Sequence, residues 1–301
     1  MTDPLDAETV RLDCYEPAGL SLSLSVRDLL GHTLVLGSSG AGKSSRVVFP
    51  VVAQLIGGGE RRGFPVGLCL HDIKADGAAE GFLRSVCAAV GRERDLIVIK
   101  PGGPCGIDFL SPLRQGALTG SDTIAGLLAP AVARDPNNTY WEKTFEVLLR
   151  QAVRLYALTE HRPAYGSFVG FLTSYLVESP LRWDGVKERV RAFGMLCDDG
   201  KGPEASVQTE IMATHGMWRD LDHRTGSILR SMAGPLLARL NAPVAHSVFG
   251  AQNAVDVAEA VAAGKIVVLS IDGMREPAFA LIGGEVHAQP ICLVPFYDPP
   301  G

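Results

Sequence analysis

32-HTLVLGSSGAGKSSRVVFPVV-52 is the segment from which the fold of this chain can first be inferred. Residues 33–36 form an apolar run that is typical of a buried strand. The next eight residues, 37–44, match the pattern G-x-x-x-x-G-K-[ST] at every position. A helix is predicted from Gly42 to Ile56, ended by three glycines, and Pro50 predicts a kink or an early end. A strand, a glycine-rich loop and a helix in this order are typical of a phosphate-binding loop.

The residue types in this loop suit a triphosphate. Glycines allow the backbone N–H groups to approach phosphate oxygens, and the N-terminus of the following helix favours an anion. Lys43 is predicted to reach the β- and γ-phosphates, and the Ser44 hydroxyl is predicted to bind Mg²⁺. The predicted nucleotide-binding residues are Gly37, Ser38, Ser39, Gly40, Ala41, Gly42, Lys43, Ser44 and Ser45. The alternative is a Gly/Ser-rich loop beside a surface lysine.

Composition sets wide bounds on the class of protein. The chain has 301 residues, of which 47% are hydrophobic and 20% charged, so it is an ordinary globular sequence. Its formal net charge of −5 supplies no overall attraction for nucleic acid. The six cysteines are scattered without a C-x-x-C pair, which predicts buried thiols in a reducing compartment. An acidic N-terminus and the lack of a long apolar run predict a soluble, cytoplasmic protein.

The rest of the chain alternates strands and helices and then becomes helical. Strands over 66–72 and 95–101, with a helix over 78–90 between them, predict a parallel sheet covered on both faces. A short strand is expected at 20–26, and sheet character returns at 264–272. The predicted organisation is a lead-in (1–31), the first part of a nucleotide-binding domain (32–120), a helical insert (121–240), a return to the sheet (241–282) and an irregular tail (283–301).

Two aspartates are candidates for the carboxylate that holds Mg²⁺ and supports hydrolysis. Asp72 ends the strand 66–72 and Asp272 ends the strand 264–272, so both are expected at the carboxyl edge of the sheet. We take Lys43, Asp72 and Asp272 as catalytic candidates, and Ser44 with Asp72 as metal ligands. The alternative for each aspartate is a strand-end residue that caps the next turn.

Several spaced segments together resemble a known family. They are 32–52, 68-LCLHDIKADG-77, 90-VGRERDLIVIKPGG-103, 107-IDFLSPL-113 and 138-NTYWEKTFEVLLRQAVRLY-156. In this order they are similar to the coupling proteins of type IV secretion and conjugation, the TraG/TraD-like DNA-transfer ATPases. The run 72-DIKAD-76 stands where the family has D-P-K-G-E, and 111-SPL-113 stands for its N-P-L turn. The resemblance extends from about Leu20 to Leu281.

The resemblance implies a P-loop NTPase with a RecA-like, mostly parallel sheet and an inserted all-helical subdomain. It implies ATP and Mg²⁺ as cofactors and a ring of identical subunits, with a hexamer as one candidate. Single-stranded DNA or a relaxase–DNA complex would be the substrate, and type IV secretion components would hold the protein at the inner membrane from the cytoplasmic side. The family's insert is thought to face DNA or secreted substrate, which makes Arg134, Lys143 and Arg150 candidates for contact.

Two departures keep alternatives open. The family's members usually begin with transmembrane helices, and their metal carboxylate and adjoining glutamate lie on a strand beyond the segment that resembles 264–272. We interpret the chain as a truncated or frame-shifted copy, which leaves ATP hydrolysis open. The alternatives are a DNA-pumping ATPase of the FtsK/HerA kind, a non-hydrolysing nucleotide-binding remnant or regulatory subunit, and a small-molecule kinase.

Overall fold

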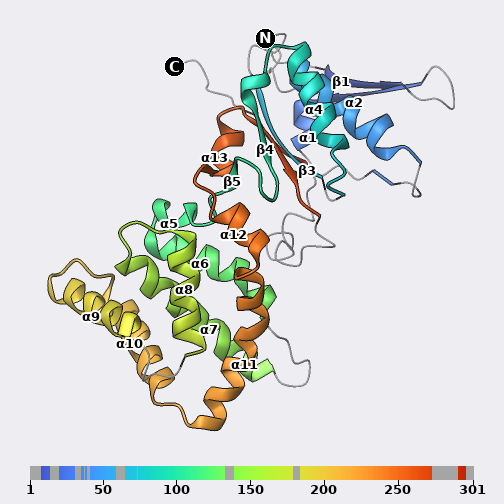
Figure 1. Cartoon of the computed structure of the whole chain (residues 1–301). Helices are drawn as coiled ribbons and strands as arrows, with labels where there is room; N and C mark the ends of the chain where they lie inside the picture. The colour runs from blue at the N-terminus through green and yellow to red at the C-terminus, as the bar shows by residue number, and fades with distance from the viewer. Residues whose placement is uncertain are drawn as a thin grey trace. The chain divides into compact units, whose positions relative to one another are not determined.

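The computed structural model describes residues 8–13, 20–30, 35–36, 38, 41–58, 65–72, 74–132, 139–178, 184–272 and 291–295. The chain divides into two compact units, which we describe separately (Figure 1). The first, here the sheet unit, comprises Met1–Cys105, Val255–Met274 and Gln289–Gly301. The second, here the helical unit, comprises Gly106–Ala254 and Arg275–Ala288.

A four-stranded sheet forms the centre of the sheet unit. Its strand order is β4 (Leu96–Ile99), β7 (Ile266–Ser270), β3 (Val66–Asp72) and β8 (Ile291–Pro295). β7 pairs in parallel with both β4 and β3, whereas β8 pairs antiparallel with β3. The near-continuous apolar runs of β3 and β7 are typical of strands covered on both faces. The predicted α/β class with a parallel sheet is therefore confirmed for three strands.

Helices cover both faces of this sheet. On one face α2 (Phe49–Gly57) and α4 (Ala78–Ala89) pack over Leu68 and Leu70 of β3 and over the matching residues of β7. On the other face α13 (Val257–Ala262) crosses β3 so closely that a Cβ at Gly67 would lie 1.8 Å from the carbonyl oxygen of Val261. Only glycine allows this approach, because any side chain would collide with the α13 backbone.

The helix that follows the phosphate-loop motif begins with a widened turn. A π-helix over Lys43–Val48 leads directly into α2, and the Phe49 N–H bonds to the carbonyl of Ser44, five residues back. Pro50 has no N–H to donate to residue 46, so the regular four-residue spacing is interrupted where proline enters the helix. The predicted irregularity at Pro50 thus takes the form of a π-turn, and the helix ends at Gly57 with Gly58 as its C-cap.

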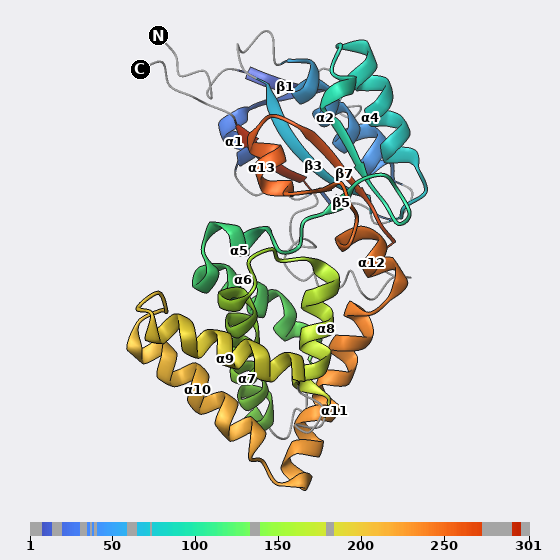
Figure 2. The same cartoon turned by 60° about the vertical axis from the view of Figure 1, so that its left-hand side comes forward.

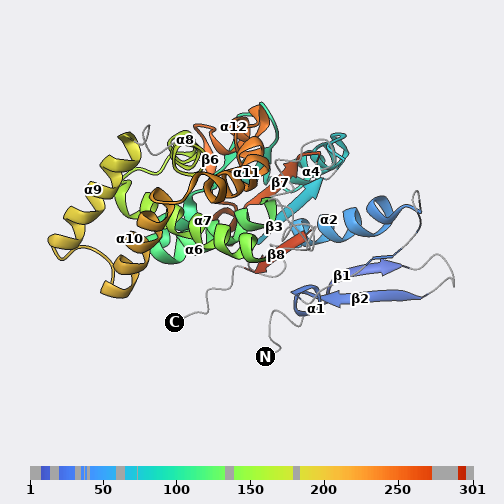
Figure 3. The same ribbon diagram turned by 90° about the horizontal axis from the view of Figure 1, so that it is seen from below.

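A hairpin of β1 (Glu8–Asp13) and β2 (Ser21–Ser25) packs beside α2, and α1 (Val26–Leu30) follows it (Figure 3). The strand expected at 20–26 is confirmed by β2, whereas β1 was not predicted. Val10 and Leu55 share a small apolar cluster that joins the hairpin to α2. The Gln54 side chain also exchanges hydrogen bonds with the backbone of Arg11, at 2.9 and 3.0 Å, and so fixes the position of the hairpin along α2.

Two expectations about the sheet differ from the structure. Of the buried strand expected at 33–36, residues 33–34 lie outside the described residues. Val35 and Leu36 are not in a strand, and Leu36 is 81% exposed. They cannot pair with β3, because β7 and β8 already occupy both of its edges. The tail 283–301, expected to be irregular, contributes β8. Ile291–Pro295 is a short apolar run, and proline is tolerated at the end of an edge strand.

The helical unit contains the predicted insert, and Figure 2 shows its helices gathered around α7. Five helices, α6, α8, α9, α10 and α11, contact α7. The buried side of α7 carries large apolar residues, among them Phe145, Leu148 and Tyr156. The helices of this unit are α5 (Ser111–Gln115), α6 (Ala117–Leu128), α7 (Thr139–Thr159), α8 (Tyr165–Leu176), α9 (Asp184–Asp198), α10 (Ala205–Arg219), α11 (His223–Leu240) and α12 (Pro243–Phe249). Two short strands, β5 (Gly106–Ile107) and β6 (Ala254–Val255), pair with each other.

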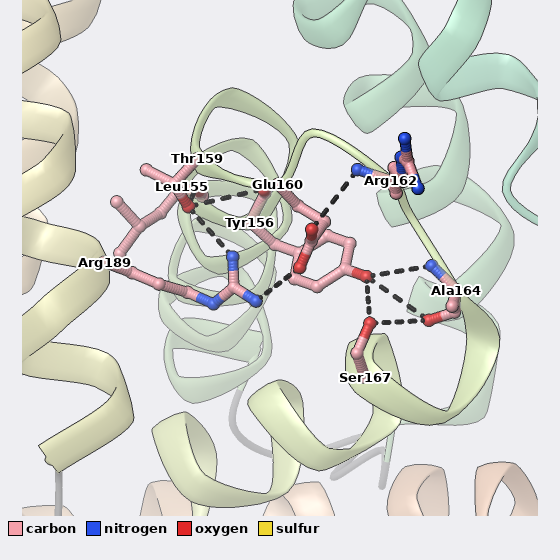
Figure 4. A network of polar contacts seen from close by, with 8 residues as sticks. All are labelled: Leu155, Tyr156, Thr159, Glu160, Arg162, Ala164, Ser167 and Arg189. Atoms are coloured by element: carbon pink, nitrogen blue, oxygen red, sulfur yellow. Dashed lines mark hydrogen bonds and ion pairs between the residues drawn. The ribbon is translucent and has the colours of Figure 1, made fainter.

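A polar network joins three helices of this unit (Figure 4). The Arg189 guanidinium of α9 donates to the Thr159 hydroxyl of α7 at 3.2 Å and to the Glu160 carboxylate at 2.7 Å. It also lies 4.8 Å from the ring centre of Tyr156, whose hydroxyl is 2.7 Å from the Ser167 hydroxyl of α8. Arg189 therefore satisfies its charge while packing against an aromatic ring, which fixes α9 against α7.

None of the helices in the described part of the chain combines the length and apolar character that a membrane crossing requires.

Candidate functional site

Six of the nine residues predicted to bind nucleotide are among the described residues. Gly37, Ser39 and Gly40 lie outside them. The Ala41 N–H donates to the Ser38 carbonyl at 3.2 Å, and the Lys43 Nζ donates to the same carbonyl at 2.8 Å. The lysine is thus folded back on the loop that precedes it, so its ammonium would have to leave the Ser38 carbonyl to reach a phosphate.

Gly42 is a position where glycine is needed. Its φ of 81° and ψ of 21° lie in the left-handed region, immediately before the helix begins at Lys43. A Cβ there would lie 3.0 Å from Cδ of Arg46, whose backbone N–H donates to the Gly42 carbonyl at 2.7 Å. The second glycine of the motif thus reverses the chain into the first turn of the helix.

The start of this helix presents donors to an incoming anion. The first N–H groups of a helix have no carbonyl partner within it, and here they include those of Ser44 and Ser45. Both serine side chains are exposed, and the Ser45 hydroxyl makes a 3.4 Å contact with the Gly42 carbonyl. N–H groups and exposed hydroxyls beside the Lys43 ammonium form a set of donors suited to an anion.

Packing within the sheet unit places this helix start at the carboxyl edge of the sheet. α4 begins just after β3 ends, so the first turns of α4 lie at that edge. Phe82 of α4 stacks on Phe49 at the start of α2, with ring centres 4.2 Å apart and an interplanar angle of 8°. The first turns of the two helices are therefore side by side, and Lys43 lies at the same edge as the end of β3.

Asp72, the last residue of β3, has a carboxylate oxygen at this edge that lacks a hydrogen-bond donor in the described part of the chain. Its Oδ2 is buried, and no donor in the described part of the chain reaches that atom. Burial raises the pKa of Asp72, and the negative charge of Asp76 adds to the increase, while the N–H groups of Lys74 and Ala75 partly offset it. A buried carboxylate oxygen without a donor is costly unless a cation or an ordered water satisfies it.

The turn after Asp72 is strained. Ala75 has a φ of 48°, in the left-handed region, and its N–H donates to the Asp72 carbonyl at 3.2 Å. A side chain in this region costs energy, and such positions often lie at functional sites. Asp76, which precedes the N-cap Gly77, accepts a 3.0 Å hydrogen bond from the Ala78 N–H at the start of α4 and adds negative charge near Asp72.

Asp272 lies at the same edge on the neighbouring strand. Asp72 is in register with Ser270, and Asp272 follows Ser270 by two residues. The structure thus brings the two predicted aspartates to adjacent parallel strands, with Asp272 half-buried just beyond the end of β7. The expectation that both follow strands at the carboxyl edge agrees with their positions.

A further charged pair at this edge was not predicted. Lys100 directly follows β4, and its Nζ lies 2.9 Å from Oε2 of Glu80 in the first turn of α4. Arg84, one turn further along α4, binds the other carboxylate oxygen of Glu80 at 2.8 Å. These hydrogen bonds, first from Lys100 and then from Arg84, lower the pKa of Glu80. The pairing depends on how α4 packs on β4, so spacing in the sequence gave no signal for it.

The chemical types of the donors and acceptors at this edge suit a nucleotide bound with magnesium. In the described part of the chain no group of three or more His, Cys, Asp or Glu side chains forms a metal site by itself. A magnesium ion bound with a nucleotide needs few protein ligands, because phosphates and waters fill most of its coordination. One hydroxyl and one carboxylate oxygen lacking a donor are therefore a sufficient set in chemical terms.

The sheet unit is thus an α/β unit in which three of the four sheet strands are parallel, and it carries a glycine-rich helix start and two aspartates at the carboxyl edge. No family model, no curated protein and no solved structure matches the chain.

Proposed function

We propose that this protein binds ATP with Mg²⁺ at the carboxyl edge of the sheet unit. The observation that carries the proposal is that G-x-x-x-x-G-K-S leads into a helix start at the same edge as Asp72. A triphosphate brings negative charge to helix-start N–H groups and an ammonium. Asp72 supplies an oxygen that lacks a donor in the described part of the chain.

Each residue has a defined role in this proposal. Lys43 exchanges the Ser38 carbonyl for β- and γ-phosphate oxygens, and the N–H groups at the helix start bind the same phosphates. Ser44 and Asp72 would hold Mg²⁺, which when bound neutralises charge on the phosphates. Asp272, which follows the neighbouring strand β7, would orient a water molecule or accept a proton from it.

For the activity of the whole protein, we propose ATP-driven transfer of single-stranded DNA or a protein–DNA complex by a ring of subunits, as a type IV secretion coupling protein. The support is the order of the family-like segments and an exposed stripe on α7. In this stripe Tyr140, which is 66% exposed, is followed by the exposed cations Lys143 and Arg150. Aromatic and cationic side chains together suit single-stranded nucleic acid. Arg134 lies outside the described residues.

Two other functions compete with this one. A DNA pump of the FtsK/HerA kind would use the same phosphate site. A non-hydrolysing nucleotide-binding subunit is favoured by a specific observation, because neither Asp72 nor Asp272 is followed by a glutamate that could act as a base. The two classes differ in one measurable property, which is turnover.

Nucleotide binding and ATP turnover, each with and without single-stranded DNA, test the proposal. Lys43→Ala is expected to weaken Mg-ATP binding at least tenfold, a loss of about 1.4 kcal/mol or more. Lys187→Ala, which removes an exposed lysine from α9, is the matched control and should bind as wild type does. Asp72→Asn should bind nucleotide but lose its Mg²⁺ dependence.

The outcomes separate the candidates. DNA-stimulated turnover that Lys43→Ala abolishes supports a DNA-transfer ATPase. Tight binding without turnover supports the regulatory subunit. Equal binding by wild type and Lys43→Ala would overturn the nucleotide site itself.

A further inference from the structure

Two cysteines from distant parts of the sequence lie opposite each other at the edge of the sheet. In the antiparallel pairing of β3 with β8, Cys69 is in direct register with Cys292. The flanking partners, Leu68 with Leu293 and Leu70 with Ile291, show that the register is regular on both sides of the pair. The cysteine pair therefore lies in the middle of the paired segment.

Direct register brings the two Cα atoms to a separation at which a disulfide can form. Opposed residues of an antiparallel pair have Cα atoms about 4.5–5.5 Å apart, and both types of opposed pair fall within the range of about 4.4–6.8 Å found for disulfides. Opposed residues also lie on the same face of the sheet. Cys69 alternates with Leu68 and Leu70 and so shares the face of Gly67, over which α13 passes.

Burial determines which reagents can reach the pair. The Cys69 side chain is 8% exposed, so its thiol is protected from bulky reagents. A partner held in register reacts within the molecule, at a far higher effective concentration than any external thiol. The other cysteines with described side chains are Cys87, a buried residue of α4 that packs on the opposite face of the sheet, and the half-buried Cys105 and Cys197.

We propose that Cys69 and Cys292 form a redox-sensitive pair that oxidises to a disulfide and ties β8 to β3. Each thiol loses one proton and one electron as the sulfur–sulfur bond forms. Both electrons pass to a low-molecular-weight oxidant. Hydrogen peroxide is reduced to two waters, or a small disulfide is reduced to two thiols through a mixed-disulfide intermediate.

The disulfide would hold β8 along the side of β3, the strand that ends at Asp72. In the reduced state no disulfide joins the two strands, and backbone pairing holds β8 on β3. In the oxidised state it is attached covalently, and the edge of β3 is closed to any other strand. Oxidation would thus fix the arrangement of strands at this edge, and reduction would release it.

The experiment oxidises the full-length protein with diamide or oxidised glutathione and maps its tryptic peptides without reduction. The expected result is a single Cys69–Cys292 cross-link in most molecules, with the intact protein about 2 Da lighter through loss of two hydrogens. Iodoacetamide labelling of the denatured, oxidised protein should still modify Cys105 and Cys197.

Two variants test the register itself. Cys292→Ser with Leu293→Cys moves the second thiol by one position, which turns it to the other face of the sheet, so cross-linking to Cys69 should be lost. A second protein carries Leu70→Cys and Ile291→Cys in place of the native pair, with Cys69→Ser and Cys292→Ser. Its new thiols are again opposed and should cross-link.

The cross-linking results test the proposed Cys69–Cys292 pair independently of nucleotide binding. Cross-linking in wild type and the 70/291 protein, but not in the shifted variant, supports it. The proposal is overturned if Cys69 and Cys292 stay free under conditions that cross-link the 70/291 protein. It is equally overturned if no pair cross-links, or if Cys69 links to other cysteines as readily. ATP binding is not needed for any of these readouts, so the failure of one proposal does not imply failure of the other.

Discussion

Replacing Gly120 by alanine is expected to destabilise the helical unit, although alanine is the better helix former. Gly120 lies in α6 against α5, and a Cβ there would be 2.1 Å from the carbonyl oxygen of Pro112 and 2.7 Å from the backbone nitrogen of Leu113. These obstacles are backbone atoms, which cannot rotate aside, so α5 and α6 would have to separate by about 1.4 Å to reach contact distances of roughly 3.5 Å.

The magnitude follows from two opposing terms. Overpacking of this kind costs about 1–3 kcal/mol, and we take the upper end because backbone must move. The better helix propensity of alanine returns about 1 kcal/mol, which leaves a net loss of about 2 kcal/mol. Gly126, six residues further along α6, has no atom within 4 Å of the point that a Cβ would occupy, so Gly126→Ala should gain about 1 kcal/mol.

Thermal and urea unfolding, followed by circular dichroism at 222 nm, measures the difference between these two single-methyl variants. They should differ by about 3 kcal/mol, which corresponds to roughly 6–12 °C in Tm for a unit of this size. Because both changes are Gly→Ala in one helix, the contribution of helix propensity cancels from the difference in stability, and the contribution of packing remains. A Gly120→Ala protein as stable as Gly126→Ala would refute the close approach of α5 and α6.

Three further predictions concern buried polar groups and strain. Gln151→Met should stabilise the protein by about 1 kcal/mol in thermal unfolding, since both polar atoms of Gln151 are buried and lack a partner in the described part of the chain. A lower Tm would show that an ordered water satisfies them. Asp72→Asn should be more stable than wild type at neutral pH without nucleotide. Because the pKa of Asp72 is raised in the folded protein, folding takes up protons there and wild-type stability falls as pH rises through the raised pKa. The advantage of the variant should therefore shrink as pH falls toward about 4, and an advantage that grows in acid would contradict this sign. Ala75→Gly should add about 0.5–1 kcal/mol in urea unfolding by relieving the left-handed φ, and a loss of stability would argue against that conformation.

Local pattern in the sequence determined most of the secondary structure. The apolar runs that predict β3 and β7, and the helical periodicity of α4, act over a few residues, and each of these elements appears close to its expected bounds. The position of Asp72 at a strand end follows from the same pattern, because a buried strand stops where a charged residue meets the sheet edge.

Tertiary structure decided which distant segments meet. The sequence predicts neither the pairing of β8 with β3, which sets Cys69 opposite Cys292, nor the contact of Lys100 with Glu80. Ile291–Pro295 is too short for periodicity to specify a strand, so its conformation comes from the free edge of β3 that accepts its hydrogen bonds. Hydrogen bonds between strands and contacts between helices depend on long-range packing. A local sequence pattern therefore determines where helices and strands form, and only the folded chain determines which of them pack or pair with one another.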